Sequence, residues 1–220
     1  MRKWGNQGRA FTRRLESEAL TIKDLLIKQS DSPSTNDLKE ARAFLLDVEL
    51  WKADCLEEKT GLAAMNGNHE IWHALLGVIN AVDDLRALRS VMTLVGFGSA
   101  KDEITGQRRA KRATAVMRFL EPDNWGVVDW RTAAFLCLYD HYKGDCEQVL
   151  KHGSNLLSAK EARDTWDVIN EQLALQYVQR YRTMRDAAFT RAVDVELALY
   201  GASFLVWPPH KQRNQFIPTQ

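Results

Sequence analysis

Three short stretches in the middle of the chain decide its fold: LVGFG at 94–98, KRATAV at 111–116 and VVDWR at 127–131. Glycine adopts backbone dihedral angles that other residues avoid, and it lets the main chain approach a ligand closely. A helix that begins nearby directs its free amides toward an anion. A glycine turn followed by a basic helix start and an isolated aspartate therefore predicts a phosphate-binding turn between two helices.

Helical periodicity extends over nearly the whole chain. Long segments between the five prolines carry apolar residues at helical spacing, whereas alternating, strand-like runs are nearly absent. The sequence therefore predicts an all-α protein. The expected helices span residues 11–29, 36–59, 69–81, 83–94, 107–120, 130–142, 159–181 and 185–203.

The composition indicates one globular unit over residues 1–220. Hydrophobic residues make up 45% of the chain and include seven Trp, so a chain of this length can bury a substantial core. We expect the hairpin and the chemical site in about 83–142. Prolines and polar residues predict an extended tail over 207–220.

Positive charge is clustered along the chain. The formal net charge is only +1, so affinity for nucleic acid requires a local concentration of cations. The segment 104–120 contains no acidic residue, and its cations are Arg108, Arg109, Lys111, Arg112 and Arg118. A solvated helix face is the alternative interpretation of such a run.

The sequence gives no sign of a metal, a cofactor or a membrane segment. Cys55, Cys137 and Cys146 form no paired motif, which argues against a disulfide framework, a zinc site and an iron–sulfur cluster. His69 and His73 share one helix face, and we interpret them as a surface pair. No apolar run has the length of a signal peptide or a membrane span. We expect a monomer of the reducing cytoplasm, associated with the nucleoid in a bacterium.

The stretch KRATAV at 111–116, with Asp129 standing 18 positions after Lys111, resembles the motif of the helix-hairpin-helix DNA glycosylases. This superfamily includes endonuclease III and the 8-oxoguanine glycosylases. The stretches FLEP at 119–122 and GVVDWR at 126–131 are similar to a bacterial and plant branch of 8-oxoguanine-glycosylase-like proteins.

Two more distant stretches, LWK at 50–52 and RAVD at 191–194, also resemble positions of that branch. The resemblance covers about residues 45–200, and the segment 94–131 is its most specific part. It implies a two-lobed helical fold with the DNA cleft between the lobes, the N-terminal and C-terminal helices forming the second lobe.

The resemblance implies double-stranded DNA as the partner and a glycosylase activity. A damaged or modified base would be flipped out of the duplex, and its N-glycosidic bond would be cleaved. Asp129 would stabilise the positive charge that develops on the sugar. Lys111 would attack the sugar carbon and form a Schiff base, which permits strand cleavage. The expected role is DNA repair, with removal of modified bases from foreign DNA as a second role.

The hairpin departs from the family pattern. In the family the lysine stands two residues after the second glycine, whereas residues 99–110 separate Gly98 from Lys111 here. Lys101 lies nearer to Gly98, and a tight turn at 104–106 is another interpretation. We favour Lys111, because the downstream spacing constrains helix geometry more tightly than loop length does.

Further candidate residues surround this motif. The expected phosphate contacts are Gly96, Gly98, Arg108, Arg109, Arg112 and Arg131. Arg131 has an alternative role as the partner of Asp140 or Glu147. The candidates for the base pocket are Trp51, Trp125 and Trp130, since aromatic stacking accepts any base; Trp is otherwise mostly a core residue in such a protein.

Three other interpretations stay open. In a monofunctional glycosylase, water attacks and Lys111 contacts only DNA. In a non-catalytic helix-hairpin-helix DNA-binding protein, Asp129 only caps the next helix. A helical interaction module without a nucleic-acid role is the third, and its binding would not depend on salt.

Overall fold

The computed structural model describes residues 5–29, 32–52, 61–99, 110–188 and 190–208. Within these ranges the regular structure is helical and contains no strand, which confirms the predicted all-α class. The helices are α1 (Gly5–Lys28), α2 (Thr35–Lys52), the 3-10 helix η2 (Ala63–Met65), α3 (Asn68–Ile79), α4 (Asp84–Met92), α5 (Lys111–Leu120), α6 (Trp130–His141), α7 (Cys146–Leu156), α8 (Ala159–Thr165), α9 (Glu171–Ala188) and α10 (Ala192–Val206).

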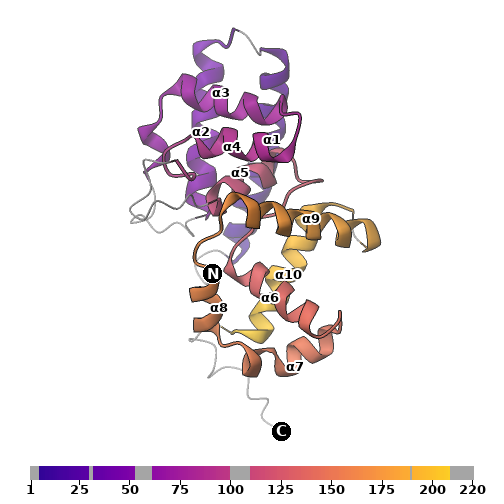
Figure 1. Ribbon diagram of the computed structural model, residues 1–220. Coiled ribbons are helices and arrows are strands. Elements are labelled where there is room, and N and C mark those ends of the chain that lie inside the picture. Colours follow the sequence, from indigo (N-terminus) through magenta and orange to yellow (C-terminus); the bar gives the residue numbers. More distant parts are fainter. Residues whose placement is uncertain (1–4, 30–31, 53–60, 100–109, 189, 209–220) are drawn as a thin grey trace.

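The helices form two groups that meet where α5 leads into α6 (Figure 1). The upper group contains α1 to α5, with α5 contacting α1, α2 and α4. In the lower group α10 packs on α6 and α7, and α8 packs on α6. Helix α9 contacts both groups, through α4 above and α10 below.

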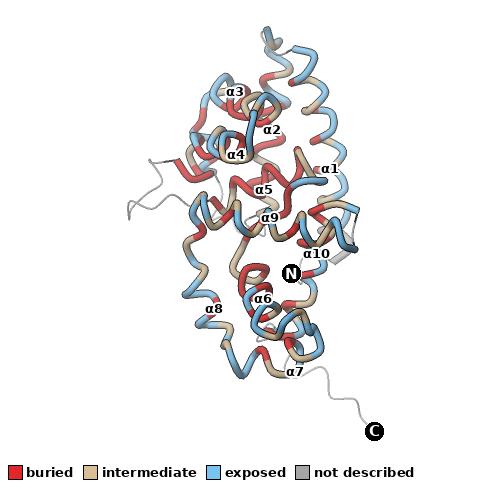
Figure 2. Tube along the Cα trace, turned by 45° about the vertical axis from the view of Figure 1, so that its right-hand side comes forward, coloured by how far each residue is buried: buried red, intermediate tan, exposed pale blue. Residues whose placement is uncertain are grey.

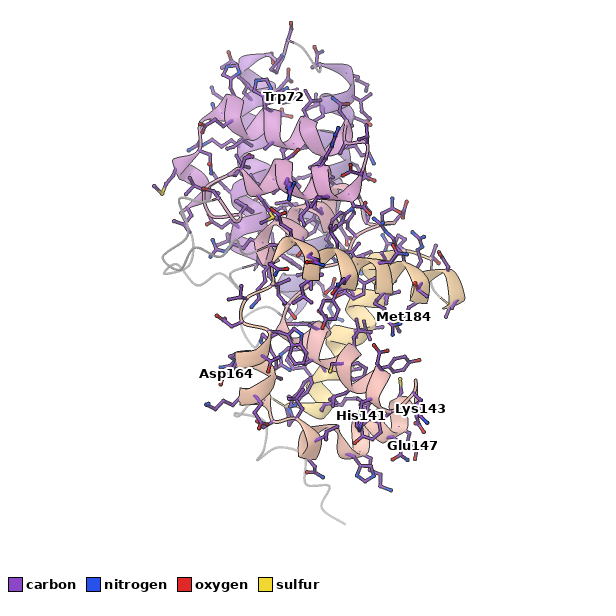
Figure 3. All side chains as sticks on the ribbon, viewed as in Figure 1. Trp72, His141, Lys143, Glu147, Asp164 and Met184 are labelled. Carbon is purple, nitrogen blue, oxygen red and sulfur yellow. The ribbon has the colours of Figure 1, made fainter. Side chains whose placement is uncertain are left out.

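Buried residues lie on the inward faces of the helices (Figure 2). In α1 they recur at spacings of three and four, which places them on one helix face: Leu15, Ala19, Ile22 and Leu26. Helix α5 differs, because every residue from Ala113 to Leu120 is buried. It is the central helix of the upper group, whose interior also holds Trp72 of α3 (Figure 3).

The predicted single helix over 159–181 is wrong. The structure has α8 and α9 there, separated by residues 166–170. Ile169 is buried, and its carbonyl accepts a hydrogen bond from the amide of Ala110 at 2.7 Å. The side chain of Asn170 then caps α9 by accepting from the amide of Leu173 at 2.9 Å. The helix is interrupted because the carbonyl of Ile169 binds the amide of Ala110 and not an amide of its own helix.

Helix α7 is absent from the predicted helices, and α10 begins and ends later than the predicted 185–203. Only Val149 and Gly153 of α7 are buried. Its sequence signal is the cap, because Asp145 accepts a hydrogen bond from the amide of Gln148 at 3.1 Å.

The two ends of the lower group have different environments. The turn from α6 to α7 carries polar side chains outward, including His141, Lys143 and Glu147 (Figure 3). At the other end, Trp207 is buried and its indole donates a hydrogen bond to the carbonyl of Leu157 at 2.8 Å. Trp207, the first residue of the predicted extended tail, is thus packed against the fold, and residues 209–220 lie outside the described ranges.

The glycine turn follows α4 as predicted. Gly96 and Gly98 have positive φ angles of +87° and +108°, a conformation that favours glycine. Asn66 fixes the turn by accepting from the amide of Val95 at 2.8 Å and donating to its carbonyl at 3.0 Å. The remainder of the loop, with the candidate Lys101 and the alternative turn at 104–106, lies outside the described residues.

We predict that Gly96→Ala destabilises the protein by about 2–4 kcal/mol, because it adds a strained φ angle and a clash. A Cβ at this position would lie 2.7 Å from Cβ of Leu62. The matched control is Gly61→Ala, which has a similar φ of +97° but open space around it. The control should lose about 1 kcal/mol. Urea unfolding of both variants measures the difference, and equal losses would contradict the packing argument.

Candidate active site

Asp129 is the N-cap of α6, at the end of the segment that leads from α5 of the upper helix group to α6 of the lower one. Its Oδ1 accepts hydrogen bonds from the amides of Arg131 at 2.9 Å and Thr132 at 3.3 Å. The Thr132 hydroxyl in turn accepts from the amide of Asp129 at 3.2 Å. This capping box fixes the direction of the carboxylate, and it confirms the expectation that Asp129 begins a helix.

The second carboxylate oxygen of Asp129 faces a lysine. Nζ of Lys52, the last residue of α2, lies 3.4 Å from Oδ2 of Asp129. Each side chain is 17% exposed, so the pair is sheltered but reachable from solvent. Lys52 was not predicted as a site residue. Its sequence signal is the LWK stretch at 50–52, which resembles the same family as the Asp129 motif.

The extended segment that leads to Asp129 is held on three sides. The amide of Val128 donates to the hydroxyl of Thr114 on α5 at 3.2 Å. The hydroxyl of Tyr181 on α9 donates to the carbonyl of Val127 at 3.0 Å. A Cβ at Gly126 would lie 2.6 Å from Cβ of Glu196 on α10. The position of Asp129 is therefore set by three helices and not by its own helix alone.

Lys111 is the first residue of α5, and its ion pair is with Asp167 between α8 and α9 (Nζ···Oδ1 3.9 Å). Its main chain lies near the Asp129 segment, because the Thr114 hydroxyl that accepts from Val128 also donates to the carbonyl of Lys111 at 2.9 Å. The structure thus brings the two motif segments together. The lysine that pairs with the carboxylate of Asp129, however, is Lys52.

Arg112 points toward the protein interior. Its Nη1 lies 3.1 Å from Oε1 of Glu49 and 3.5 Å from the carbonyl of Gly96. Glu49 is 1% exposed, and its carboxylate also accepts from three successive amides at 61–63. Arg112 therefore neutralises a buried charge next to the glycine turn. Its role as a phosphate contact stays a prediction, and Arg108 and Arg109 lie outside the described residues.

Arg131 is partly buried between α6 and the end of α10. Its Nη1 donates to the carbonyl of Trp207 at 3.1 Å, and its guanidinium lies over the ring of Phe204 at 4.1 Å. Burial lowers the pKa of Arg131 from its ordinary value. The alternative partner Asp140 forms an ion pair with Arg180 instead.

The three candidate tryptophans have different environments. Trp125 is 2% exposed, and the structure therefore assigns it to the core. Trp51 and Trp130 are half-buried and stand next to Lys52 and Asp129 in the sequence. The Trp51 ring packs edge-on against Phe119 at 5.0 Å, and Trp130 packs on Trp207 at 5.9 Å.

Behind Lys52 and Asp129 lies a buried charge network that the sequence did not reveal. Arg118 of α5 is 1% exposed; its Nε lies 3.4 Å from Glu196 of α10, and its Nη2 lies 3.5 Å from Glu16 of α1. The guanidinium also covers the rings of Trp51 at 5.1 Å and Phe119 at 4.5 Å. Such contacts offset part of the cost of burying a cation.

Glu196 is electrostatically linked to the candidate site. The pKa of Glu196 is raised to about 7: burial raises it most, Asp129 also raises it, and Arg118 and Lys52 lower it. A buried carboxyl group with a perturbed pKa beside a second carboxylate and a lysine is typical of functional sites.

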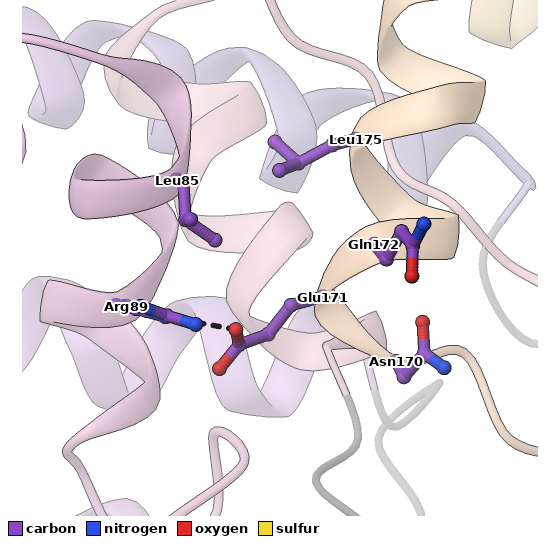
Figure 4. Close-up of a pocket in the computed structure, with 6 residues that line it drawn as sticks. All are labelled: Leu85, Arg89, Asn170, Glu171, Gln172 and Leu175. Atoms are coloured by element: carbon purple, nitrogen blue, oxygen red, sulfur yellow. Dashed lines mark hydrogen bonds and ion pairs between the residues drawn. The ribbon is translucent and has the colours of Figure 1, made fainter.

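A surface pocket lies elsewhere, between α4 and the start of α9 (Figure 4). An ion pair between Arg89 and Glu171 crosses it at 2.8 Å. Its lining residues are Leu85, Arg89, Asn170, Glu171, Gln172 and Leu175. None of them belongs to the predicted site or to the Lys52–Asp129 pair.

The described residues contain no group of three or more side chains suited to a metal ion. His69 and His73 are exposed, with ring centroids 6.4 Å apart, which confirms the surface pair. Cys137 and Cys146 are exposed free thiols. Within the same ranges, no helix is both long and apolar enough to cross a bilayer.

Comparison with protein families, curated proteins and solved structures gives no match to this chain.

We predict that Glu196 makes the stability of the protein depend on pH. Its carboxyl group has an ordinary pKa of 4.5 when unfolded and about 7 when folded, so only the folded state holds the proton between these values. The stabilising contribution is complete below pH 4.5 and is lost as the pH rises through 7, a change of roughly 3 kcal/mol.

Urea unfolding of the wild type and Glu196→Gln from pH 4.5 to pH 8 measures this contribution as the difference between their free energies of unfolding. The exposed control Glu147→Gln should follow the wild type. A constant difference between the wild type and Glu196→Gln across the range would contradict the prediction.

Proposed function

We propose that this protein is a DNA glycosylase of the helix-hairpin-helix type. The observation that carries the proposal is the fixed carboxylate of Asp129, which begins α6 directly after α5 and has one oxygen engaged with backbone amides and the other with Lys52. The glycine turn before α5 and the resemblance of the segment 94–131 support the same conclusion.

The chemistry needs a carboxylate in a fixed place. Cleavage of an N-glycosidic bond develops positive charge on the sugar, and a negative group already in position stabilises that charge without reorganising. The helix cap holds the carboxylate of Asp129 in place, because two amides bind Oδ1 while Oδ2 faces Lys52 on the partly exposed side.

The arrangement of the helices suits a duplex bound across the junction. In the proposed fold the duplex would bind between the upper and lower helix groups, and Asp129 ends the segment that connects them. This division differs from the expected one, because within the described ranges the N-terminal helices α1 and α2 pack on α3 and α5 and not on the C-terminal helices. A target base is inaccessible inside a duplex, so the enzyme flips it out at a cost of a few kcal/mol in stacking. The half-buried Trp51 precedes Lys52 in the sequence, and the half-buried Trp130 follows Asp129. We propose that these two side chains stack on the flipped base.

We predict that Asp129→Asn abolishes base release but keeps DNA binding. Asparagine still caps a helix, so the fold and the DNA surface are retained, whereas the negative charge is lost. The assay is single-turnover base release from duplexes that each carry one 8-oxoguanine, uracil, alkylated purine or 5-hydroxymethylcytosine. The expected loss is at least about 100-fold, on the scale of other electrostatic groups.

A second candidate function is supported by the same cap. The complete capping box gives Asp129 a structural role in a non-catalytic DNA-binding protein as well. That alternative predicts DNA binding by the wild type and Asp129→Asn alike, with no base release from any duplex.

We predict that binding to a duplex weakens steeply with salt. Buried or partly buried partners engage Arg112 and Arg131, so Arg108 and Arg109 remain of the expected cationic phosphate contacts. We add Lys111, whose partner Asp167 is largely exposed. Three contacts give a slope of about −3 in a plot of log K against log salt. Arg108→Ala and Arg109→Ala should each reduce the slope by about 1. Fluorescence anisotropy with a labelled duplex measures it, and a flat plot would favour an interaction module.

A further inference from the structure

The two candidate lysines, Lys52 and Lys111, have different ion-pair partners. Nζ of Lys52 lies 3.4 Å from Oδ2 of Asp129, in a pair whose side chains are both 17% exposed. Nζ of Lys111 lies 3.9 Å from Asp167, whose side chain is 58% exposed. The amine beside the fixed carboxylate therefore comes from the end of α2, 77 positions before Asp129 in the sequence.

We propose that Lys52 is the catalytic lysine of this site, the amine that adds to the sugar carbon C1′ next to Asp129. The inference rests on the proposed function, because it takes Asp129 as the group that faces C1′. Lys111 then contacts phosphate at the start of α5, where a cation follows the glycine turn.

The geometry supports Lys52 in three ways. The Asp129 carboxylate cannot rotate freely, since two amides hold its other oxygen. Any sugar that approaches Oδ2 therefore also approaches Nζ of Lys52. The buried Glu196 adds a second carboxyl group to the electrostatic surroundings of the amine, since Lys52 lowers the pKa of Glu196.

The proposed step on an abasic site balances as follows. The Lys52 ammonium gives one proton to Oδ2 of Asp129, and the neutral amine adds to the C1′ aldehyde to form a carbinolamine. Asp129 returns the proton to the hydroxyl group, water leaves, and a protonated imine joins Nζ to C1′. On an intact nucleotide the same amine forms the C1′–Nζ bond while the glycosidic bond breaks and its electron pair leaves with the base.

A duplex with one natural abasic site tests the step without knowledge of the target base. Sodium cyanoborohydride reduces an imine at C1′ to a stable amine, so the wild type should become covalently attached to the DNA. Peptide mass spectrometry should place the attachment on Lys52.

The decisive variant is Lys52→Arg. The guanidinium keeps the charge that pairs with Asp129, but it stays protonated and forms no imine. We expect at least a tenfold loss of the covalent adduct, with unchanged affinity for a duplex that carries a tetrahydrofuran abasic analogue. Lys111→Arg tests the competing assignment, because arginine keeps a phosphate contact but forms no imine, and loss of the adduct in this variant would identify Lys111 as the nucleophile. Lys160→Arg, an exposed lysine of α8, is the neutral control.

Three outcomes overturn the proposal: an adduct on Lys111, an adduct that survives Lys52→Arg, or no adduct from a wild type that binds the abasic duplex. The last outcome, combined with base release that requires Asp129, leaves a monofunctional glycosylase. The proposed function itself fails separately, when no duplex in the base-release assay loses its base.

Discussion

One buried cation, the guanidinium of Arg118, connects the helices on which the rest of the structure depends. It lies in α5 and contacts Glu16 of α1, Trp51 of α2 and Glu196 of α10. An unpaired charge inside a protein is strongly destabilising, so these contacts must form together for the upper and lower helix groups to dock. The arrangement therefore favours one relative placement of α2 and α10 over looser alternatives.

The same network explains how a site can form between residues that are far apart in the sequence. Trp51 precedes Lys52, and Glu196 packs against the backbone of Gly126, three residues before Asp129. By fixing Trp51 and Glu196 around one guanidinium, the fold also fixes the lysine and the aspartate that stand beside them. The contacts that hold the helices together therefore also hold Lys52 next to Asp129.

The sequence predicted the parts of the structure that depend on residues close together in the chain, namely the helices and their caps. Apolar periodicity predicted the all-α class, and the aspartate before a polar helix start predicted the cap at Asp129. The break at 166–170 has no such signal, because it depends on a hydrogen bond from Ala110 to Ile169. Spacing rules do not predict the Lys52–Asp129 pair either, since it forms only when the end of α2 comes next to the start of α6 in the folded chain.

The two oxygens of Asp129 show how stability and chemistry are divided within one side chain. Oδ1 satisfies backbone amides at the start of α6, a contribution of about 1 kcal/mol that any good capping residue supplies. Oδ2 contributes little to the helix, and its contact with Lys52 is a partly exposed ion pair of modest energy. Helix capping therefore requires at this position only a side chain that accepts hydrogen bonds. The proposed chemistry requires in addition a negative charge that faces an amine.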